Sequence, residues 1–340
     1  MKFVEMSATG FGEDNLRTVE ADAPRPGPGE VLLRMRAASL NYRDLLMVRG
    51  QYNPRQPLPL VPCSDGVGEV VALGEGVRRV AVGQRASPIF ASGWLSGPPT
   101  AQTTRMTRGG PLHGTLATHL VVPAGDLVIP PAHLTDAEAA CLPCAAVTAW
   151  SALVTLGGLQ PGQSVLVQGT GGVALFALQI AAAMGARVIQ TSSQDEKLAR
   201  TAAMGAAAGI NYVREPRWGR AARGLAGGDG VDHIVELGGA GTLGESLRAV
   251  RPGGTISLIG VLAGGSAPLN ITPILMRQIR VQGVFVGHRA SFEALCAFLA
   301  DNPGVRPTIS DTFGLGEAAD ALRHMAAGGH FGKIVIDLSQ

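Results

Sequence analysis

Residues 164–174 read Ser-Val-Leu-Val-Gln-Gly-Thr-Gly-Gly-Val-Ala, and this stretch decides the fold. A short aliphatic run enters a glycine loop, and an apolar helix is predicted directly after it. Gly169 and Gly171 fill the first two small positions of a dinucleotide-binding fingerprint, and Ala174 fills the third. Small residues are needed there because the backbone must approach a pyrophosphate closely and offer it the free N–H groups of a helix N-terminus. A second strand is predicted at Arg187–Thr191, at the spacing that such a unit requires.

The composition is that of a globular enzyme with a large core. The chain has 340 residues, of which 46% are hydrophobic and 16% are charged, and it contains 47 glycines. A formal net charge of +2 gives no reason to expect nucleic acid or an acidic membrane surface as a partner. No apolar run is long enough to span a bilayer, and the first ten residues lack the pattern of a signal peptide. Four cysteines do not make a disulfide framework, so a cytoplasmic location is expected.

From about residue 146 the sequence alternates between strands and helices, which predicts a doubly wound parallel sheet, an α/β Rossmann fold. Besides the two strands around the glycine loop, the predicted strands are Gly209–Tyr212, Asp232–Glu236, Thr255–Ile259 and Val281–Val286. The predicted helices between them include Leu175–Met184, Lys197–Ala203 and Thr242–Val250.

The remainder of the chain has a different pattern. Its first hundred residues read as short strands broken by turns, including strands at Glu30–Ala37 and Gly68–Leu73. The tail contains helices and a final strand that do not continue the alternation, at Ser291–Ala300, Gly316–Ala327 and Lys333–Asp337. We therefore expect a dinucleotide-binding domain at residues 146–287 and a second, mostly β domain formed by residues 1–145 together with 288–340.

Eight segments in a fixed order resemble the medium-chain dehydrogenase/reductase superfamily over essentially the full length. Besides the fingerprint they are Pro-Gly-Pro-Gly-Glu-Val (26–31), Asn-Tyr-Arg-Asp (41–44), Asp-Gly-Val-Gly-Glu-Val-Val (65–71), Val-Gly-Gln-Arg (82–85), Leu-Pro-Cys-Ala-Ala-Val-Thr-Ala-Trp (142–150), Gln-Pro-Gly-Gln (160–163) and Gly-Lys-Ile-Val-Ile (332–336). The resemblance implies that the mostly β domain is a GroES-like catalytic domain.

The resemblance also bears on metals. Zinc-dependent members hold a catalytic metal with a Cys, a His and a second Cys, and the matching positions here are Asn41, Ser64 and Cys144. One thiol with an amide and a hydroxyl is a poor zinc site, although Asp65 could contribute a carboxylate. The lobe that carries a structural zinc in those relatives matches residues 91–115, which contain no cysteine. We expect no metal, and the chain resembles the zinc-independent, quinone-oxidoreductase-like branch.

Without a metal, hydrogen-bond donors or the substrate's own conjugation must stabilise the developing negative charge. Alcohol oxidation would also need a base, and no histidine falls in the matched motifs; the seven are His113, His119, His133, His233, His288, His324 and His330. This pattern favours hydride transfer to a quinone or an α,β-unsaturated carbonyl. A zinc-independent alcohol dehydrogenase or aldehyde reductase is the alternative, and a non-catalytic NADPH-binding protein is a remote one.

Two polar residues are predicted to be catalytic. Asn41 and Tyr52 match the branch's N-terminal active-site segment and are expected to contact the cofactor or the substrate. Asn41 is also open to interpretation as a turn-forming asparagine after a strand. Tyr52 fits equally well as a wall of the pocket or as a proton donor.

The end of the second strand favours NADP, as NADPH, over NAD. NAD sites place an acidic residue there to bind the ribose 2′-hydroxyl, whereas this chain has Ser192. Lys197 follows five residues later, and Tyr212 closes the third predicted strand. The hydroxyl of Ser192, the cation and the phenol together suit a 2′-phosphate. The alternative is a solvated lysine at a helix start, with little discrimination between the two cofactors.

The resemblance implies further cofactor contacts and a quaternary structure. The remaining expected cofactor residues are Thr148, Gly172, Val173, Gly238, Gly260, Val261, Val286 and Lys333, the last reaching the phosphates. A homodimer is expected, paired edge to edge through the strand at Val281–Val286. Cys141 and Cys144 are expected to be packing residues, and Cys63 is expected to be open to alkylation by electrophilic enones.

Overall fold

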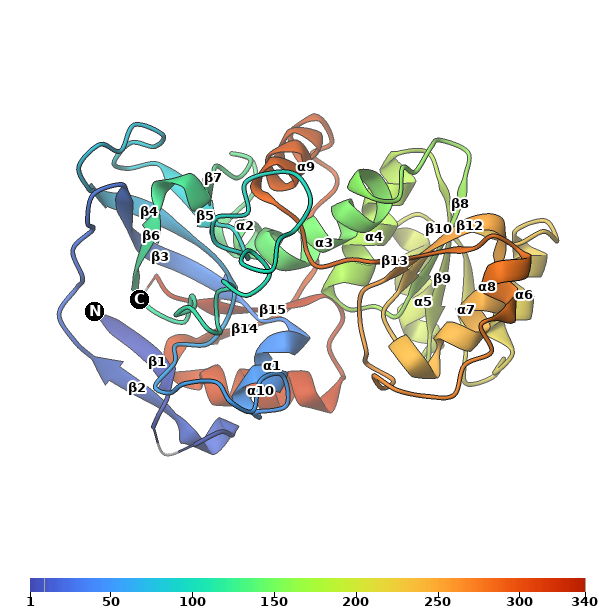
Figure 1. The fold of residues 1–340 in the computed structure, drawn as a ribbon, viewed down its shortest axis with the longest axis horizontal. Helices are drawn as coiled ribbons and strands as arrows, with labels where there is room; N and C mark the ends of the chain where they lie inside the picture. The colour runs from blue at the N-terminus through green and yellow to red at the C-terminus, as the bar shows by residue number, and fades with distance from the viewer. Residues whose placement is uncertain (9, 340) are drawn as a thin grey trace. The chain divides into compact units, whose positions relative to one another are not determined.

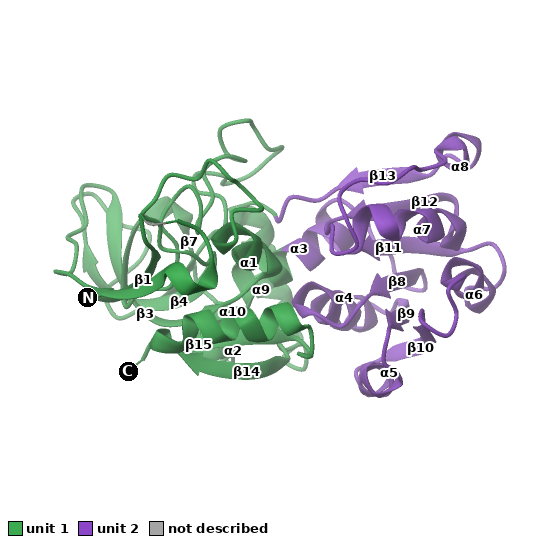
Figure 2. Cartoon of the chain, turned by 90° about the horizontal axis from the view of Figure 1, so that it is seen from below, with its two compact units in different colours: residues 1–147, 287–340 green, residues 148–286 purple. Residues whose placement is uncertain are grey.

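The computed structural model describes residues 1–8 and 10–339 and divides into two compact units (Figure 2). Unit 1 comprises residues 1–147 and 287–340, and unit 2 comprises residues 148–286. Both boundaries lie within two residues of the expected ones. No helix in the described part of the chain is long and apolar enough to cross a membrane.

Unit 2 is the doubly wound parallel sheet that the sequence predicts (Figure 1). Its strands lie in the order β10-β9-β8-β11-β12-β13, and all neighbouring pairs are parallel. The bounds are β8 (Ser164–Gln168), β9 (Arg187–Ser192), β10 (Ala206–Asn211), β11 (Val231–Glu236), β12 (Val250–Leu258) and β13 (Arg280–Gly283). The order reverses between β8 and β11, and ligands of such sheets bind at the carboxyl ends of the strands at this point.

Helices cover both faces of this sheet, which is why its central strands are almost continuously hydrophobic. The helices are α3 (Val147–Trp150), α4 (Gly172–Ala183), α5 (Asp195–Ala203), α6 (Trp218–Leu225), α7 (Leu243–Ala249) and α8 (Thr272–Met276). Helices α6 and α7 pack together on one face, over a core that contains Trp218, Leu247 and Ile256. Right-handed crossovers place α4 and α5 on the other face.

Two strands of unit 2 differ from their predicted bounds. Strand β12 begins at Val250, five residues before the predicted start, because Val250 already pairs with Val231 ahead of the Pro-Gly-Gly turn residues. Strand β13 ends at Gly283 rather than Val286. Val286 has a φ of +48°, which is incompatible with an extended strand.

Unit 1 is mostly β, as expected for a GroES-like domain. Its main sheet runs β14-β15-β3-β4-β5-β7, with β6 also paired to β3. The bounds are β3 (Glu30–Ser39), β4 (Asp65–Leu73), β5 (Arg85–Pro88), β6 (His119–Pro123), β7 (Leu127–Val128), β14 (Ile309–Gly314) and β15 (Lys333–Asp337). A separate two-stranded sheet contains β1 (Lys2–Met6) and β2 (Leu16–Glu20), and the helices are α1 (Tyr42–Val48), α2 (Asp136–Ala140), α9 (Arg289–Asp301) and α10 (Ala318–Ala327).

The register of this sheet brings three strand ends together. Strand β15 is antiparallel to β3 and pairs Val335 with Ser39, and β4 is antiparallel to β3 and pairs Asp65 with the same Ser39. The carboxyl end of β3 therefore lies between the amino ends of β4 and β15. Asn41, which begins α1, follows β3 by two residues. Side chains far apart in the sequence consequently meet at this edge of unit 1.

Candidate functional site

The glycine loop of unit 2 has room for a ligand. Gly169 has a φ of +73°, which favours glycine for backbone reasons. Gly171 has an ordinary φ of −81° and is the N-cap of α4, and a Cβ added to it would meet no protein atom within 4 Å. Packing in the protein therefore does not require glycine at this position. Gly172 and Val173 are partly exposed in the first helical turn, and the loop fits a dinucleotide.

A buried hydrogen-bond network holds the loop after β11. The fully buried Glu236 carboxylate accepts from the backbone N–H groups of Gly238 and Gly239, both at 3.0 Å, and from the hydroxyls of Thr242 and Ser246. Gln168, at the end of β8, donates to Glu236 at 2.8 Å and accepts from the backbone N–H of Gly238 at 3.1 Å. The two strands at the reversal point are therefore linked by side chains directly beside the glycine loop.

The other expected cofactor residues of unit 2 lie in different environments. A Cβ on Gly238 would lie 2.2 Å from the Thr242 hydroxyl, and one on Gly260 would lie 2.3 Å from the Leu237 carbonyl, so packing alone explains both glycines. Val261 is 53% exposed, and Thr148 is buried. Val286 is a β-branched residue at positive φ, a strained conformation that is concentrated at functional sites.

Strand β9 ends in Ser192, and the acidic residues that follow it, Asp195 and Glu196, lie in the first turn of α5. Asp195 is paired with Asn211 at 2.7 Å and with Arg214 at 2.6 Å. Ser192 is buried, and its hydroxyl accepts the backbone N–H of Gln194 at 3.2 Å. Tyr212 is 42% exposed, and partial burial together with the neighbouring Arg200 lowers the pKa of the half-buried Lys197 ammonium. Proximity of two cations favours an anionic ligand here.

In unit 1, Lys333 lies where the three strand ends meet. Its Nζ is buried and donates to the Leu40 carbonyl and to Asn41 Oδ1, both at 2.6 Å, and lies 3.6 Å from Asp65 Oδ2. Asn41 Nδ2 donates to the Ser64 hydroxyl at 3.4 Å. Asn41, at a position matched to a zinc ligand, therefore contacts a lysine ammonium, and Ser64, at another matched position, contacts Asn41. This enclosure does not fit the expected reach of Lys333 to cofactor phosphates, because its hydrogens are directed at Leu40 and Asn41.

Asp44 is a second buried carboxyl in this cluster. One of its oxygens accepts the backbone N–H of Asn41 at 2.8 Å and so fixes the start of α1, while the other is buried without a hydrogen bond. Burial raises the pKa of Asp44 to about 6, against the opposing effect of Arg43 and Lys333, and nearby Asp65 raises it further.

We expect Asp44→Asn to stabilise the protein at neutral pH. The folded-state pKa of Asp44, about 6, exceeds the ordinary aspartate value of 3.8, so the wild-type free energy of unfolding should fall as pH rises through this window. The amide still accepts the Asn41 N–H but carries no charge. At pH 7 its free energy of unfolding should therefore exceed that of the wild type by about 2–3 kcal/mol. Urea unfolding of both proteins from pH 3.5 to 7.5 measures the difference between their free energies of unfolding. A difference that does not grow between pH 4 and 6 would contradict the expectation.

Tyr52 packs on a fixed arginine. Its ring is 46% exposed, and the Arg43 guanidinium carbon lies 4.7 Å from the ring centroid. Arg43 donates to the carbonyls of Arg108, at 2.9 Å, and Gly110, at 2.6 Å, and to the Thr107 hydroxyl. Asn41 is the N-cap of α1, and Tyr52 lies in the loop after this helix. The segment 41–52 therefore carries both a hydrogen-bonding amide and an aromatic ring.

The cysteines are not arranged for redox chemistry. Cys141 is buried, its thiol contacts Ser39 and Ala137, and burial raises its pKa to about 11. Burial also raises the pKa of the partly exposed Cys144. The expectation that Cys63 is open to alkylation is wrong, because that residue is fully buried and burial raises its pKa.

Comparison with known proteins decides the family. A family described as alcohol dehydrogenase GroES-like domain matches residues 27–132, and one described as zinc-binding dehydrogenase matches residues 172–301. A zinc-type alcohol dehydrogenase-like protein of Schizosaccharomyces pombe is 39% identical over 334 residues, which cover 96% of each chain. The chain belongs to the medium-chain dehydrogenase/reductase superfamily. As a member of this superfamily it is an NAD(P)-dependent oxidoreductase.

Solved structures of this superfamily have the same fold. A protein of Sinorhizobium meliloti 1021 assigned as an alcohol dehydrogenase is 42% identical and superposes with a TM-score of 0.91, covering 99% of this chain and 98% of its own. A mycobacterial quinone oxidoreductase is 27% identical with a TM-score of 0.81 and covers 99% of both chains. The superfamily resemblance seen in the sequence is thereby confirmed.

Many members of the superfamily hold zinc, but the donors present here do not suit it. Catalytic zinc takes three nitrogen, sulfur or carboxylate ligands, and in the part of the chain that the structure describes no three His, Cys, Asp or Glu side chains are placed to share a metal. At the matched site the amide oxygen of Asn41 and the carboxylate of Asp65 already face an ammonium. A second cation there would be repelled by Lys333.

Several residues of the site were not assigned from the sequence. Arg43 and Asp44 lay inside a quoted motif but were given no role, and Asp65 was considered only as a metal ligand. Glu236 was missed, although an acid directly before two glycines at a strand end is a readable signal for a loop anchor. The meeting of Lys333 with Asn41 depends on the pairing of β15 with β3, 292 residues apart in the sequence, for which no local signal exists.

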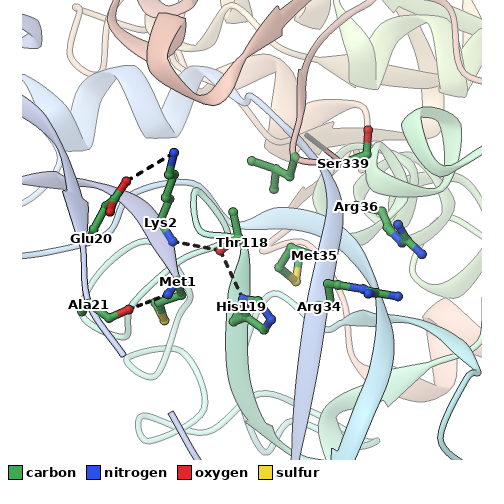
Figure 3. Close-up of a pocket in the computed structure, with 11 residues that line it drawn as sticks. Met1, Lys2, Glu20, Ala21, Arg34, Met35, Arg36, Thr118, His119 and Ser339 are labelled. Carbon is green, nitrogen blue, oxygen red and sulfur yellow. Dashed lines mark hydrogen bonds and ion pairs between the residues drawn. The ribbon is translucent and has the colours of Figure 1, made fainter. Parts of the chain in front are cut away.

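Unit 1 also has a surface cavity of about 410 Å³ that is separate from these residues (Figure 3). Its lining includes Lys2, Glu20, Arg34 and Arg36. Lys2 is paired with Glu20 at 3.3 Å, and both arginines are paired with Glu69. The two arginines share one carboxylate, so positive charges outnumber negative ones around this cavity.

Proposed function

We propose that the protein is an NADPH-dependent reductase of quinones or α,β-unsaturated carbonyl compounds that works without catalytic zinc. One observation carries the proposal: Asn41, at a position matched to a zinc ligand, accepts a hydrogen bond from the buried Lys333 ammonium, which also lies 3.6 Å from Asp65. Such a site offers hydrogen-bond donors to a carbonyl oxygen but neither a metal nor a histidine base for removing an alcohol proton.

The residues divide the work between the two units. In unit 2, the N–H groups of the loop at Gly169–Val173 would hold the cofactor pyrophosphate, and Lys197 and Tyr212 would face the 2′-phosphate. In unit 1, Asn41 would donate to the acceptor oxygen, and Tyr52 would contact the acceptor ring or chain. NADPH, when bound, would supply a hydride, which carries both electrons of the reduction. The hydride and one further proton convert a quinone to a hydroquinone, or an enone to the saturated carbonyl. Water can supply the proton.

A turnover screen on metal-analysed protein tests the proposal. NADPH oxidation is followed with quinones, enones and aldehydes, and NADP⁺ reduction is followed with simple alcohols, each with and without a chelator. We expect quinones or enones to be reduced fastest and the chelator to have no effect. Alcohol oxidation that outpaces enone reduction would favour the alcohol dehydrogenase alternative, as the names of several relatives suggest. Tight NADPH binding without turnover would indicate a non-catalytic protein.

We expect kcat/KM for NADPH to exceed that for NADH by at least tenfold, because one charge-assisted hydrogen bond to the 2′-phosphate contributes about 1.5–3 kcal/mol. Lys197→Glu should lower the NADPH value at least as much and leave the NADH value nearly unchanged. Lys2→Glu, at an exposed lysine of unit 1, is the matched control. Comparable efficiencies with the two cofactors in the wild type would overturn the NADPH assignment.

The free edge of the unit 2 sheet supports a homodimer. Strand β13 is the last strand in the sheet order, and large hydrophobic side chains before and within α8 are exposed: Ile271 by 66%, Leu275 by 77% and Met276 by 73%. A hydrophobic cluster of this kind, beside a strand with one unpaired edge, marks an interaction surface. A second copy of the chain would cover it by pairing β13 with itself.

Leu275→Glu is expected to convert this dimer into a monomer. Burying a carboxylate without a partner in an apolar interface costs several kcal/mol, which exceeds the contribution of most single interface residues. Light scattering after size exclusion measures the mass directly. Val82→Glu, at a residue of unit 1 that is 61% exposed, should leave the mass unchanged. A wild-type protein that is monomeric at micromolar concentration would contradict the dimer.

A further inference from the structure

Lys333 has an unusual position for a lysine. Its side chain is 3% exposed, and its ammonium lies among the Leu40 carbonyl, Asn41 Oδ1 and the fully buried carboxylate of Asp65. Lysine is almost never fully buried unless it is paired. The pair with Asp65 alone would satisfy the charge, yet the shortest contacts of Nζ are to the backbone and to the amide of Asn41.

This contact determines which way the Asn41 amide points. The oxygen and nitrogen of an asparagine are usually assigned by inference, but a lysine ammonium can only donate, so Oδ1 must face Lys333. Nδ2 then lies on the other side, where one hydrogen is directed at the Ser64 hydroxyl, at 3.4 Å. The backbone N–H of Asn41 is held by Asp44 at 2.8 Å. Asn41 is therefore fixed at three points while remaining partly exposed.

We propose that Lys333 is a positioning residue that takes over the electrostatic role of the absent metal by acting through Asn41. Its charge holds the amide with an N–H directed outward and polarises that N–H toward the carbonyl oxygen of the acceptor. This inference rests on the proposed function and narrows the substrate class, because the acceptor must carry a conjugated oxygen that becomes negative as the hydride adds to carbon.

The electron and proton balance of this step needs no acid from the cluster. The hydride forms a C–H bond at the carbon conjugated to the carbonyl, the π electrons move to the oxygen, and the N–H of Asn41 stabilises the resulting oxyanion. A proton from water completes the product. A hydrogen bond from an ion polarises the group that accepts it, so the outward N–H becomes a stronger donor.

Lys333 keeps its proton throughout. Burial by itself lowers the pKa of the Lys333 ammonium, but the acidic groups around it, of which the Asp65 carboxylate has the largest effect, outweigh burial and raise it. The ammonium is therefore charged across the neutral range, as a metal ion would be.

A double-mutant cycle separates this role from simple charge pairing. Lys333→Met alone leaves Asp65 buried without a partner and is expected to be unstable. The double variant Lys333→Met/Asp65→Asn removes both charges and should fold. We expect it to bind NADPH as the wild type does while its hydride-transfer rate with a quinone or enone falls roughly 10- to 100-fold. Asp65→Asn alone, which keeps the ammonium, is the second single variant of the cycle. Lys2→Met, the matched lysine control, should stay within a few-fold of wild type. If the double variant recovers both stability and rate, Lys333 is only a structural partner of Asp65.

A spectroscopic measurement gives an answer even if the proposed reaction is wrong. In protein labelled with ¹⁵N-asparagine, the side-chain amide signals of Asn41 are identified by their loss in Asn41→Asp. We expect these signals to shift in Lys333→Met/Asp65→Asn and to stay in place in Lys2→Met, without any substrate present. Unchanged Asn41 signals in the double variant would overturn the link between Lys333 and Asn41. A shift without turnover of any quinone or enone by the wild type would instead refute the proposed function alone.

Discussion

Gly171→Val is expected to weaken the binding of NADPH at least about 100-fold without unfolding the protein. The φ of Gly171 is −81°, which valine adopts readily, and its Cβ would extend into space that contains no protein atom within 4 Å. A bound pyrophosphate would need that space to reach the N–H groups at the start of α4. Loss of two hydrogen bonds to a charged group, at about 1.5 kcal/mol each, corresponds to the stated factor.

The measurement is fluorescence titration with NADPH, together with thermal unfolding of the free protein. The N-cap change should cost only about 1 kcal/mol of stability. Gly169→Val is the informative contrast, since a β-branched residue at a φ of +73° strains the backbone and should destabilise the protein as well. Gly304→Val, at another open glycine, should affect neither quantity. Wild-type affinity in Gly171→Val would mean that the phosphates lie elsewhere.

Asn41→Asp is expected to lower the rate of hydride transfer about 100-fold while the protein stays folded. The carboxylate has the same shape as the amide and still accepts the hydrogen bond of Lys333, but it cannot donate to a substrate oxygen. Removal of one such donor typically costs a factor of about 100 to 1,000 in kcat.

Rapid mixing of the NADPH complex with a quinone or enone measures this step directly. Asn302→Asp, at an asparagine that only binds the end of α9, should leave the rate unchanged. Tyr52→Phe separates the two interpretations of Tyr52: a rate close to wild type indicates a pocket wall, and a large loss indicates a hydroxyl that participates. An Asn41→Asp protein with the wild-type rate would remove Asn41 from the reaction.

Much of unit 2 could be predicted from the sequence because its signals are local. Each strand and helix carries its own hydrophobic pattern, and the glycine loop at Gly169 depends on neighbouring residues alone. The errors fell where tertiary context overrides the local pattern. Pairing with Val231 extends β12 across a Pro-Gly-Gly sequence that resembles a turn, and the backbone of Val286 ends β13 early.

The site in unit 1 was only partly predictable. Motif matching found the three positions matched to zinc ligands, Asn41, Ser64 and Cys144, because those residues occupy recognisable segments. It did not find that Lys333 lies among them, since this depends on the antiparallel pairing of the last strand with β3. Cys63, which the linear sequence suggests is exposed, is fully buried, and its thiol contacts the carbonyls of Ser39 and Asp65 at the ends of β3 and β4. Long-range register, rather than residue type, was the information that the sequence lacked.

The Lys333 ammonium also constrains how such a protein can be redesigned or can evolve. Asn41→Cys with Ser64→His would restore the ligand types of a zinc enzyme, yet the incoming ion would meet a fixed positive charge held 3.6 Å from Asp65. Repulsion between cations in a poorly solvated interior is costly, so the third change, at position 333, would be required at the same time. A zinc-dependent site and a site that contains Lys333 are thus separated by intermediates. These intermediates carry either both the zinc ion and the lysine ammonium, or neither of them. A lysine contributed by the last strand makes the transition between metal-dependent and metal-free chemistry difficult to reverse in single steps.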